Sequence, residues 1–156
     1  MKALIQRVKW ARVDVDGEIV GEIGPGILTL FGVGASDAEK DVEWVIGKIA
    51  KLRIFPDDSG KMNRSLLDLG PTAGHLLVSQ FTLYADTRKG NRPSFIGAGK
   101  PEIARKLYEH AITVSRGLGL TTANGVFQAD MAVSLLNDGP VTLMIDSELE
   151  NSVELA

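Results

Sequence analysis

Residues 11–23, ARVDVDGEIVGEI, carry the strongest hairpin signal in the chain. The stretch folds about Asp16-Gly17, and an Asp-Gly pair favours a tight turn between antiparallel strands. The preceding stretch KALIQRV, residues 2–8, reads as a strand, and GPGILTLFGVG, residues 24–34, follows as another strand between glycines. The first part of the chain therefore predicts a sheet.

Two later stretches have helical spacing. A capping box of Ser36 and Glu39 predicts the start of a helix whose apolar stripe is Val42, Val45, Ile46, Ile49 and Leu52. Pro101 suits the first turn of a second helix that runs to about Arg116 and ends at Gly117. Its inward residues are expected to be Ile103, Ala104, Leu107, Ala111 and Ile112.

The remaining segments return to strand character. HLLVSQFTLYA, residues 75–85, predicts a long apolar strand through the centre of the sheet, and RIFPDDSGKMN, residues 53–63, reads as strand and turn. VFQADMAVSLL and VTLMID predict two strands that flank a turn at residues 137–140, NDGP. We expect one compact α+β domain over residues 1–156, with a largely antiparallel, barrel-like sheet and two main helices.

Composition excludes several classes of protein. The chain has 156 residues, no cysteine and a formal net charge of −3, which argue against thiol chemistry, disulfides and a broad nucleic-acid-coating surface. Gln6, Arg7 and Lys9 interrupt the N-terminal apolar residues, so we expect a soluble, cytoplasmic protein without a membrane partner.

A basic segment lies between the central strand and the second helix. Between Asp86 and Lys100 the chain carries one acidic residue, Asp86, and four basic residues: Arg88, Lys89, Arg92 and Lys100. This segment is either an ordinary solvated loop or a contact for phosphate.

Conventional catalytic and cofactor motifs are absent from the sequence. His75 and His110 have no metal-ligand spacing around them and are expected to be structural. No GxSxG elbow, GxGxxG or P-loop occurs, so we expect no metal and no cofactor.

Two polar clusters remain as candidates for chemistry. Ser79, Gln80, Phe81 and Thr82 interrupt the apolar strand, where buried polar groups need partners, either in the core or in a ligand. Strand alternation would point Ser79 and Phe81 to one face and the other two to the opposite face, so backbone N–H groups could matter more than hydroxyls. Residues 137–142, NDGPVT, are either turn chemistry or, if Gly139-Pro140 is cis, a functional element.

At these clusters the sequence resembles the D-aminoacyl-tRNA deacylase family, whose signatures are an SQFTLY strand and an NxGPVT segment. Both are intact, as Ser79–Tyr84 and Asn137–Thr142. The likeness extends to MKALIQRV, GKMNRSLLD, DTRKGNRPSF and ADMAVSLLNDGPVTL. One departure is Gln128, where many members have glycine.

The resemblance implies a homodimeric enzyme that hydrolyses D-aminoacyl-tRNA and glycyl-tRNA. Gly139-Pro140, in cis, would reach into the partner's pocket and reject L-amino acids, with Arg7 holding its carbonyls. Ser79, Gln80, Phe81 and Thr82 would shape the pocket for the terminal adenosine and the ester. Met131 would lie alongside, although Phe127, Ala129, Met131 and Val133 alternate like a core face.

The sequence leaves two mechanisms open, and it also leaves two other functions open. The 2′-hydroxyl of the terminal adenosine could activate water, or Thr82 could act as a covalent nucleophile. The basic residues Arg88, Lys89 and Arg92 could contact tRNA. The chain could instead be a non-catalytic module that binds the tRNA acceptor end, or an esterase of small metabolites.

Overall fold

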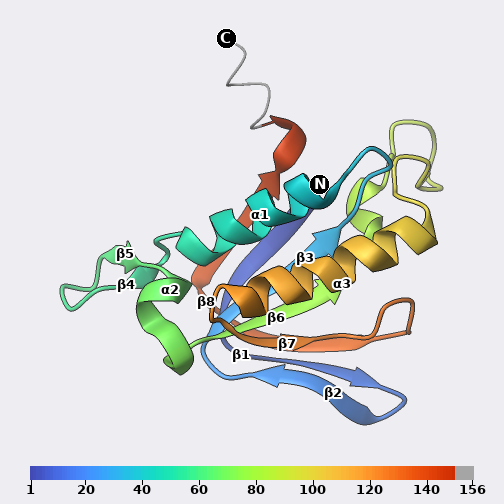
Figure 1. Cartoon of the computed structure of the whole chain (residues 1–156). Coiled ribbons are helices and arrows are strands. Elements are labelled where there is room, and N and C mark those ends of the chain that lie inside the picture. The colour runs from blue at the N-terminus through green and yellow to red at the C-terminus, as the bar shows by residue number, and fades with distance from the viewer. Residues whose placement is uncertain (150–156) are drawn as a thin grey trace.

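The computed structural model describes residues 1–149, and residues 150–156, the end of the predicted domain, lie outside the described part. Figure 1 shows a strongly curved sheet with two long helices, α1 and α3, across one face. The strands are β1 (Lys2–Val15), β2 (Glu18–Ile23), β3 (Gly26–Gly32), β4 (Phe55–Pro56), β5 (Met62–Arg64), β6 (Gly74–Ser79), β7 (Thr121–Asn124) and β8 (Ala132–Asp146). The helices are α1 (Glu39–Lys51), α2 (Leu66–Leu69) and α3 (Pro101–Gly117), with 3₁₀ turns η1 (Gly70–Thr72) and η2 (Phe81–Tyr84).

The hairpin predicted at Asp16-Gly17 is confirmed. Both residues have positive φ, 51° and 84°, as a tight turn between β1 and β2 requires. The two strands expected within residues 2–15 are one continuous strand, β1, which pairs antiparallel with β2, β3 and β8. A single long strand therefore organises most of the sheet.

The sheet is mixed, with three antiparallel strand pairs, all of them made by β1, and two parallel pairs. Its order is β2-β1-β3-β6-β7, with β8 on β1, and the β3–β6 and β6–β7 pairs are parallel because helical connections return the chain between them. At Gly21 of β2, an added Cβ would lie only 2.6 Å from the carbonyl oxygen of Asn124, at the end of β7. The sheet thus curls until its ends nearly meet, which confirms the α+β, barrel-like fold class.

Two apolar clusters cover the two faces of the sheet. The larger cluster joins α1 and α3 to one face through residues such as Phe31, Leu77 and Ile46. The smaller cluster lies inside the curl and includes Val8 and Leu76. The predicted helix faces are buried, except that Leu52, the C-cap of α1, is half-buried and Ile103, in the first turn of α3, is 47% exposed.

The first helix begins later than the sequence predicted. Ser36 lies in a turn, Ala38 is the N-cap, and Asp41 supplies the capping carboxylate, accepting the Ala38 N–H at 2.9 Å. The residues before it are used elsewhere: the Ala35 N–H donates to the Gly97 carbonyl at 3.1 Å, and Asp37 accepts the Gly34 N–H at 2.6 Å. The Ser36–Glu39 capping box was therefore wrong.

Both strands that carry the candidate motifs differ from the prediction. β6 ends at Ser79, and the chain turns into η2, so the expected alternation beyond that residue was wrong. β8 begins at Ala132, because Gln128 adopts φ 65° and the Ala129 N–H donates to the Val126 carbonyl in a turn. The strand predicted over residues 126–131 was therefore wrong, but the inward alternation is present: Phe127, Ala129, Met131 and Val133 are half-buried, the residues between them are exposed, and all but Ala129 pack against the apolar clusters.

The predicted NDGP turn is a bulge within β8 rather than a hairpin end. Gln6 pairs with Thr142 and Val8 pairs with Asn137, so the chain advances two residues along β1 but five residues along β8. The extra residues loop out of the ladder. Strand β8 therefore continues on both sides of the Gly139-Pro140 pair.

His75 is structural, as expected. It is fully buried, with Nε2 2.9 Å from the Thr29 hydroxyl and Nδ1 2.8 Å from the Ser115 hydroxyl. Burial lowers the pKa of His75 to about 4 from 6.5. The neutral imidazole thus ties β6 to β3 and α3.

Acidification from pH 6.5 to pH 4 is expected to cost stability through His75. In this window the unfolded chain binds a proton that the folded protein excludes, and the loss reaches roughly 3 kcal/mol near pH 4 and then levels off. Urea unfolding at pH 7 and pH 5 measures it. His75→Leu should be less stable at pH 7 but should show a shallower fall between these pH values, and an equal fall in both proteins would contradict this account.

Candidate active site

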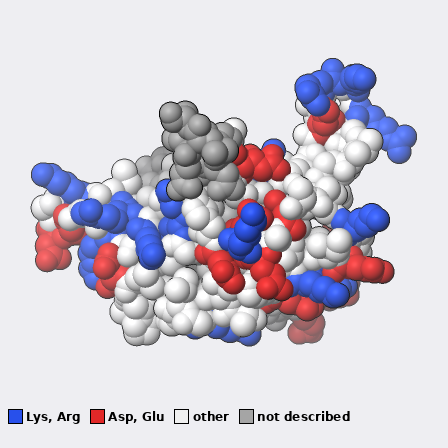
Figure 2. Space-filling model, turned by 45° about the horizontal axis from the view of Figure 1, so that its top comes forward, with Lys and Arg blue, Asp and Glu red and all other residues white. Residues whose placement is uncertain are grey.

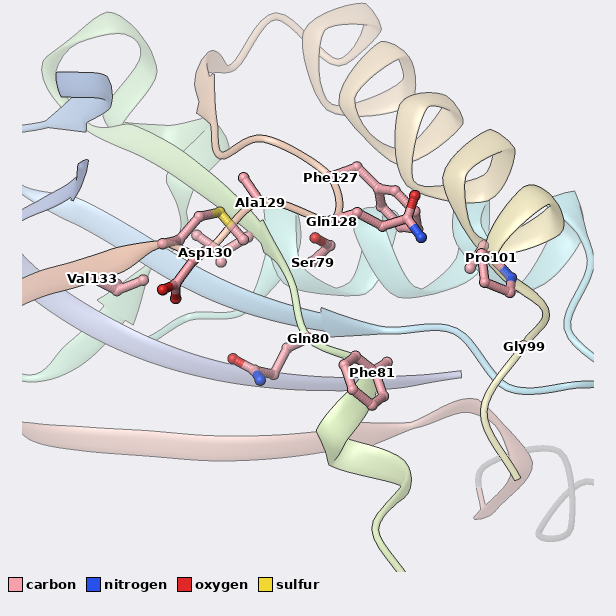
Figure 3. Close-up of a pocket in the computed structure, with 13 residues that line it drawn as sticks. Ser79, Gln80, Phe81, Gly99, Pro101, Phe127, Gln128, Ala129, Asp130 and Val133 are labelled. Carbon is pink, nitrogen blue, oxygen red and sulfur yellow. The ribbon is translucent and has the colours of Figure 1, made fainter. Parts of the chain in front are cut away.

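A cavity lies at the carboxyl ends of the parallel strands β6 and β7, where ligand sites of parallel sheets commonly form. It has a volume of about 480 Å³. Ser79, Gln80 and Phe81 line it after β6, and residues 127–131 line it after β7. The start of α3, with Pro101, closes the third side (Figure 3).

The segment after β6 presents backbone donors to this cavity. The Gln80 N–H still donates to the Phe31 carbonyl at 2.8 Å, and the first 3₁₀ bond runs from Leu83 N–H to the Gln80 carbonyl at 3.3 Å. Within residues 1–149, the N–H groups of Phe81 and Thr82 donate to no carbonyl, as expected for the first residues of a helical turn. Two free peptide donors therefore follow β6, one on Phe81, which lines the cavity, and one on its neighbour Thr82.

The polar side chains of this segment are less buried than the sequence suggested. Ser79 and Gln80 are half-buried and Phe81 and Thr82 are exposed, so no unpaired group is buried in the core. The Thr82 hydroxyl accepts a hydrogen bond from Gln80 Nε2. An amide that donates cannot remove a proton, so this contact does not activate Thr82.

Tyr84, the last residue of the 3₁₀ turn η2, fixes this turn against the body of the protein. Its hydroxyl lies 3.3 Å from Oδ2 of Asp37, which is itself almost fully buried and also pairs with the Met1 amino group at 2.8 Å. An added Cβ on Gly34 would lie 2.6 Å from the Tyr84 hydroxyl, so the ring packs directly on the backbone. Burial and the nearby Asp37 raise the pKa of Tyr84 well above its usual value, so the phenol stays neutral.

The loop after β7 forms the opposite wall and is fastened to α3. The Tyr108 hydroxyl lies 2.8 Å from the Leu77 carbonyl oxygen and 3.2 Å from that of Gly125. The Tyr108 and Phe127 rings pack with centroids 5.9 Å apart. Phe127 thereby presents an aromatic surface to the cavity.

The Gly139-Pro140 pair lies outside this cavity. Its peptide bond is cis, both residues are exposed, and Gly139 has φ 121°. Arg7 lies against it: Nε is 3.1 Å from the carboxylate of Asp138, and Nη1 donates to the Ile54 carbonyl. An added Cβ on Gly139 would lie 2.9 Å from Arg7 Nη2.

The basic loop projects from the body of the protein, and its blue side chains gather at the tip in Figure 2. Two hydrogen bonds between Asp86 and Ser94, of 2.8 and 2.9 Å, close its base. Arg88 is paired with Asp86 at 2.6 Å, which lowers the pKa of that carboxyl and raises the pKa of Arg88. Lys89 and Arg92 are exposed.

The structure brings together only part of the predicted site. One cavity is lined by Ser79, Gln80, Phe81 and Met131, whereas Thr82 is not among its lining residues. The predicted selector and the basic loop lie elsewhere in the same chain. The sequence analysis assigned no site role to several lining residues: Gly99, Pro101, Ala104, Phe127, Gln128 and Asp130. Only the departure at Gln128 was a signal for one of them.

Two kinds of feature are absent from residues 1–149. That part of the chain contains no group of three or more His, Asp or Glu side chains that could hold a metal ion. It also contains no helix long and apolar enough to cross a membrane.

Free peptide donors beside a mostly apolar cavity suit stabilisation of negative charge that develops on an attacked carbonyl group. The class defined by this fold and site is a small α+β hydrolase. Residues 4–146 match the family model described as D-Tyr-tRNA(Tyr) deacylase, and the chain belongs to this family. It is a deacylase, a carboxylic ester hydrolase, as the sequence predicted.

Relatives of known name cover nearly the whole chain. A D-aminoacyl-tRNA deacylase of Desulfitobacterium hafniense is 57% identical over 95% of this chain and 98% of its own length. One from Dechloromonas aromatica is 53% identical over 96% and 99%. A solved structure described as c-Myc DNA Unwinding Element Binding Protein has a TM-score of 0.88 at 40% identity and covers 94% of this chain and 99% of its own. A probable eukaryotic D-amino acid tRNA deacylase, TM-score 0.80 at 16% identity, shares the fold over 93% and 98% of the chains.

Proposed function

We propose that this deacylase hydrolyses the ester that joins a D-amino acid or glycine to the 3′-terminal adenosine of tRNA. The observation that carries the proposal is the pair of free N–H groups, of Phe81 and Thr82, that follow β6, the first of them on a residue that lines the cavity. The membership in the deacylase family supplies the reaction class. The aromatic wall at Phe127 suits a nucleobase, because bases stack on aromatic rings.

The chemistry needs few side chains. An aminoacyl ester is already reactive, so positioning it beside backbone donors and admitting water suffices to lower the barrier. In this scheme the Phe81 and Thr82 N–H groups bind the developing oxyanion, and the 2′-hydroxyl of the terminal adenosine assists the water. The fixed turn η2, held by Tyr84 and Asp37, keeps those donors in place.

Chirality is proposed to be set by Gly139-Pro140 of a second copy of the chain. The pair is exposed and does not line its own chain's cavity, so it is free to enter another. Backbone carbonyls at this position would bind the α-amino group and leave no room for an L side chain. Glycine, which has no side chain, would be accepted.

A homodimer is consistent with the outer surface of β8. This strand of 15 residues pairs only with β1 among the described strands, and long open edges of this kind usually find a partner. Three large apolar side chains of β8 itself are exposed: Leu136 at 48%, Leu143 at 39% and Met144 at 54%. Light scattering during gel filtration tests for the dimer.

The direct test is the release of amino acid from matched D- and L-tyrosyl-tRNA and from glycyl-tRNA. Rapid loss of the D-ester and of glycine, with the L-ester spared, is the expected result. The competing function, a non-catalytic module for the tRNA acceptor end, predicts tRNA binding without ester loss. A small-metabolite esterase predicts no preference at the α-carbon.

The change Thr82→Val separates the two mechanisms. We expect the deacylation rate of D-tyrosyl-tRNA to fall less than about tenfold, because the hydroxyl accepts a bond from Gln80 and has no base beside it. Single-turnover rates measure the effect. A loss of more than about a thousandfold, with trapping of an acyl-enzyme by the wild type, would instead make Thr82 the nucleophile.

The exposed basic residues Lys89 and Arg92, with Arg88 beside them, are proposed to contact tRNA phosphates. Their loop projects beyond the cavity-bearing body, and phosphate contacts make affinity depend on salt. Replacing Lys89 and Arg92 by glutamine would then weaken tRNA binding and reduce its salt dependence. If the salt dependence is unchanged, Lys89 and Arg92 do not contact tRNA phosphates and the segment is an ordinary solvated loop.

A further inference from the structure

Gln128 has an unusual backbone for a residue with a long side chain. Its φ is 65°, and Asp16 in the β1–β2 turn is the only other non-glycine residue with positive φ in the described chain. The left-handed conformation is strained for an L residue and is adopted freely by glycine. Gln128 also lines the cavity after β6.

The side chain of Gln128 is held in one orientation. Its Oε1 accepts a hydrogen bond from Nη2 of Arg105 at 3.0 Å, and the Arg105 guanidinium lies 4.8 Å from the centroid of the Phe127 ring. Because a guanidinium can only donate, the amide oxygen must face Arg105 and the amide nitrogen must face away. Figure 3 shows the amide beside Phe127, at the end of the cavity where Pro101 lies.

The Nε2 group of Gln128 therefore offers donors only. It has no hydrogen-bond partner among residues 1–149 and lies beside the aromatic wall of the cavity. A purine stacked on Phe127 presents unprotonated ring nitrogens at its edge, and these accept hydrogen bonds. Donor and acceptor would meet without any movement of the backbone.

We propose that Gln128 is a specificity-determining residue whose Nε2 group donates a hydrogen bond to a ring nitrogen of the terminal adenine. This inference rests on the proposed function, since it takes the cavity to hold the aminoacylated adenosine. The Arg105–Gln128 contact positions the donor, and Phe127 supplies the stacking surface.

A purely structural role for Gln128 predicts different behaviour. If the residue only fastens the loop to α3, Gln128→Glu should bind ligand normally, because a carboxylate accepts from Arg105 more strongly than an amide does. Gln128→Gly should then loosen the loop. Under the proposal both variants lose the donor, and Gln128→Gly is at least as stable as the wild type because glycine adopts positive φ freely.

The experiment measures binding of an adenosine that carries D-tyrosine through a 3′-amide in place of the ester. Calorimetry compares the wild type, Gln128→Glu and Gln128→Gly, with the parent compound and its 1-, 3- and 7-deaza analogues. Arg116→Met is the matched control, because Arg116 makes a similar contact from α3, to Asn124 at 3.2 Å, outside the cavity. Thermal midpoints report on folding.

The expected result is a loss of about tenfold in affinity for both Gln128 variants with the parent compound, the size of one hydrogen bond. One deaza analogue should weaken wild-type binding by the same factor and should weaken the Gln128 variants no further. Normal affinity in both variants, or equal losses with the analogues in all proteins, overturns the proposal. Hydrolysis of D-tyrosyl-tRNA by the wild type is measured separately, so a failure of the proposed function is recognised on its own.

Discussion

Gly139→Ala is expected to lower the hydrolysis of D-tyrosyl-tRNA by at least about a hundredfold, the loss typical when a catalytic group is misplaced by about an ångström. An added Cβ would lie 2.9 Å from Nη2 of Arg7 and 2.9 Å from Cγ2 of Val141. The backbone also adopts φ 121°, where L side chains are strained. Arg7 can swing aside, but the φ strain falls on the backbone itself, and the Val141 nitrogen lies only 3.2 Å from the added Cβ. We therefore expect the tip of the bulge to shift, and with it the carbonyls proposed to bind the α-amino group.

The measurement is a single-turnover rate on D- and L-tyrosyl-tRNA, with the thermal midpoint as the check on folding. Gly117→Ala, where nothing lies within 4 Å of the added Cβ, is the control and should retain full activity. Pro140→Ala extends the test, because loss of the ring frees φ and should either admit the L-ester or abolish activity. Wild-type rates and chirality in both Gly139→Ala and Pro140→Ala would refute the selector.

The elements that local patterns specify were predictable from the sequence. The Asp16-Gly17 turn, the apolar stripe of α1 and the Pro101 start of α3 depend on neighbours in the chain, and each is present. The start of α1 was not predictable from Ser36, because the residues on either side of it are held by distant partners: the Ala35 N–H donates to the Gly97 carbonyl and Asp37 accepts from the Met1 amino group. These tertiary contacts place the N-cap at Ala38 rather than at Ser36.

The candidate site was harder to predict for the same reason. Apolar residues continue past Ser79, so periodicity alone extended the strand, whereas the chain turns into η2 because Tyr84 packs on Gly34 and bonds to Asp37. The prediction that residues 79–82 are buried depended on extending this strand beyond Ser79, where it in fact ends. The motif residues were found by resemblance, but their geometry required the connections after β6 and β7 to meet.

The opposite wall of the cavity had no sequence motif of its own. Phe127 and Gln128 were assigned to a core strand, because they precede the strand residues of β8 without a proline or glycine between them. The positive φ of Gln128 and its bond to Arg105, 23 residues earlier, turn the chain there instead. A departure from a family pattern was thus the informative feature of this segment.

Gly26→Ala is expected to cost at least about 4 kcal/mol of folding stability, which belongs to the exceptional range for single substitutions. Strands β3 and β6 meet most closely where Gly26 pairs with Gly74. A Cβ on Gly26 would lie 1.9 Å from the Gly74 carbonyl oxygen and 2.7 Å from its nitrogen, so backbone and not a flexible side chain opposes it. The two strands would have to separate at the parallel pair that begins β6.

Urea unfolding and the yield of folded protein measure the effect of Gly26→Ala. The matched control is Gly24→Ala, two residues earlier, where nothing lies within 4 Å of the added Cβ. We expect the control to remain within about 0.5 kcal/mol of the wild type, as surface substitutions usually do. A comparably small effect for Gly26→Ala would mean that β3 and β6 shift apart freely. The cavity after β6 could then not rest on a rigid sheet, and the fixed donors of Phe81 and Thr82 would lose their support.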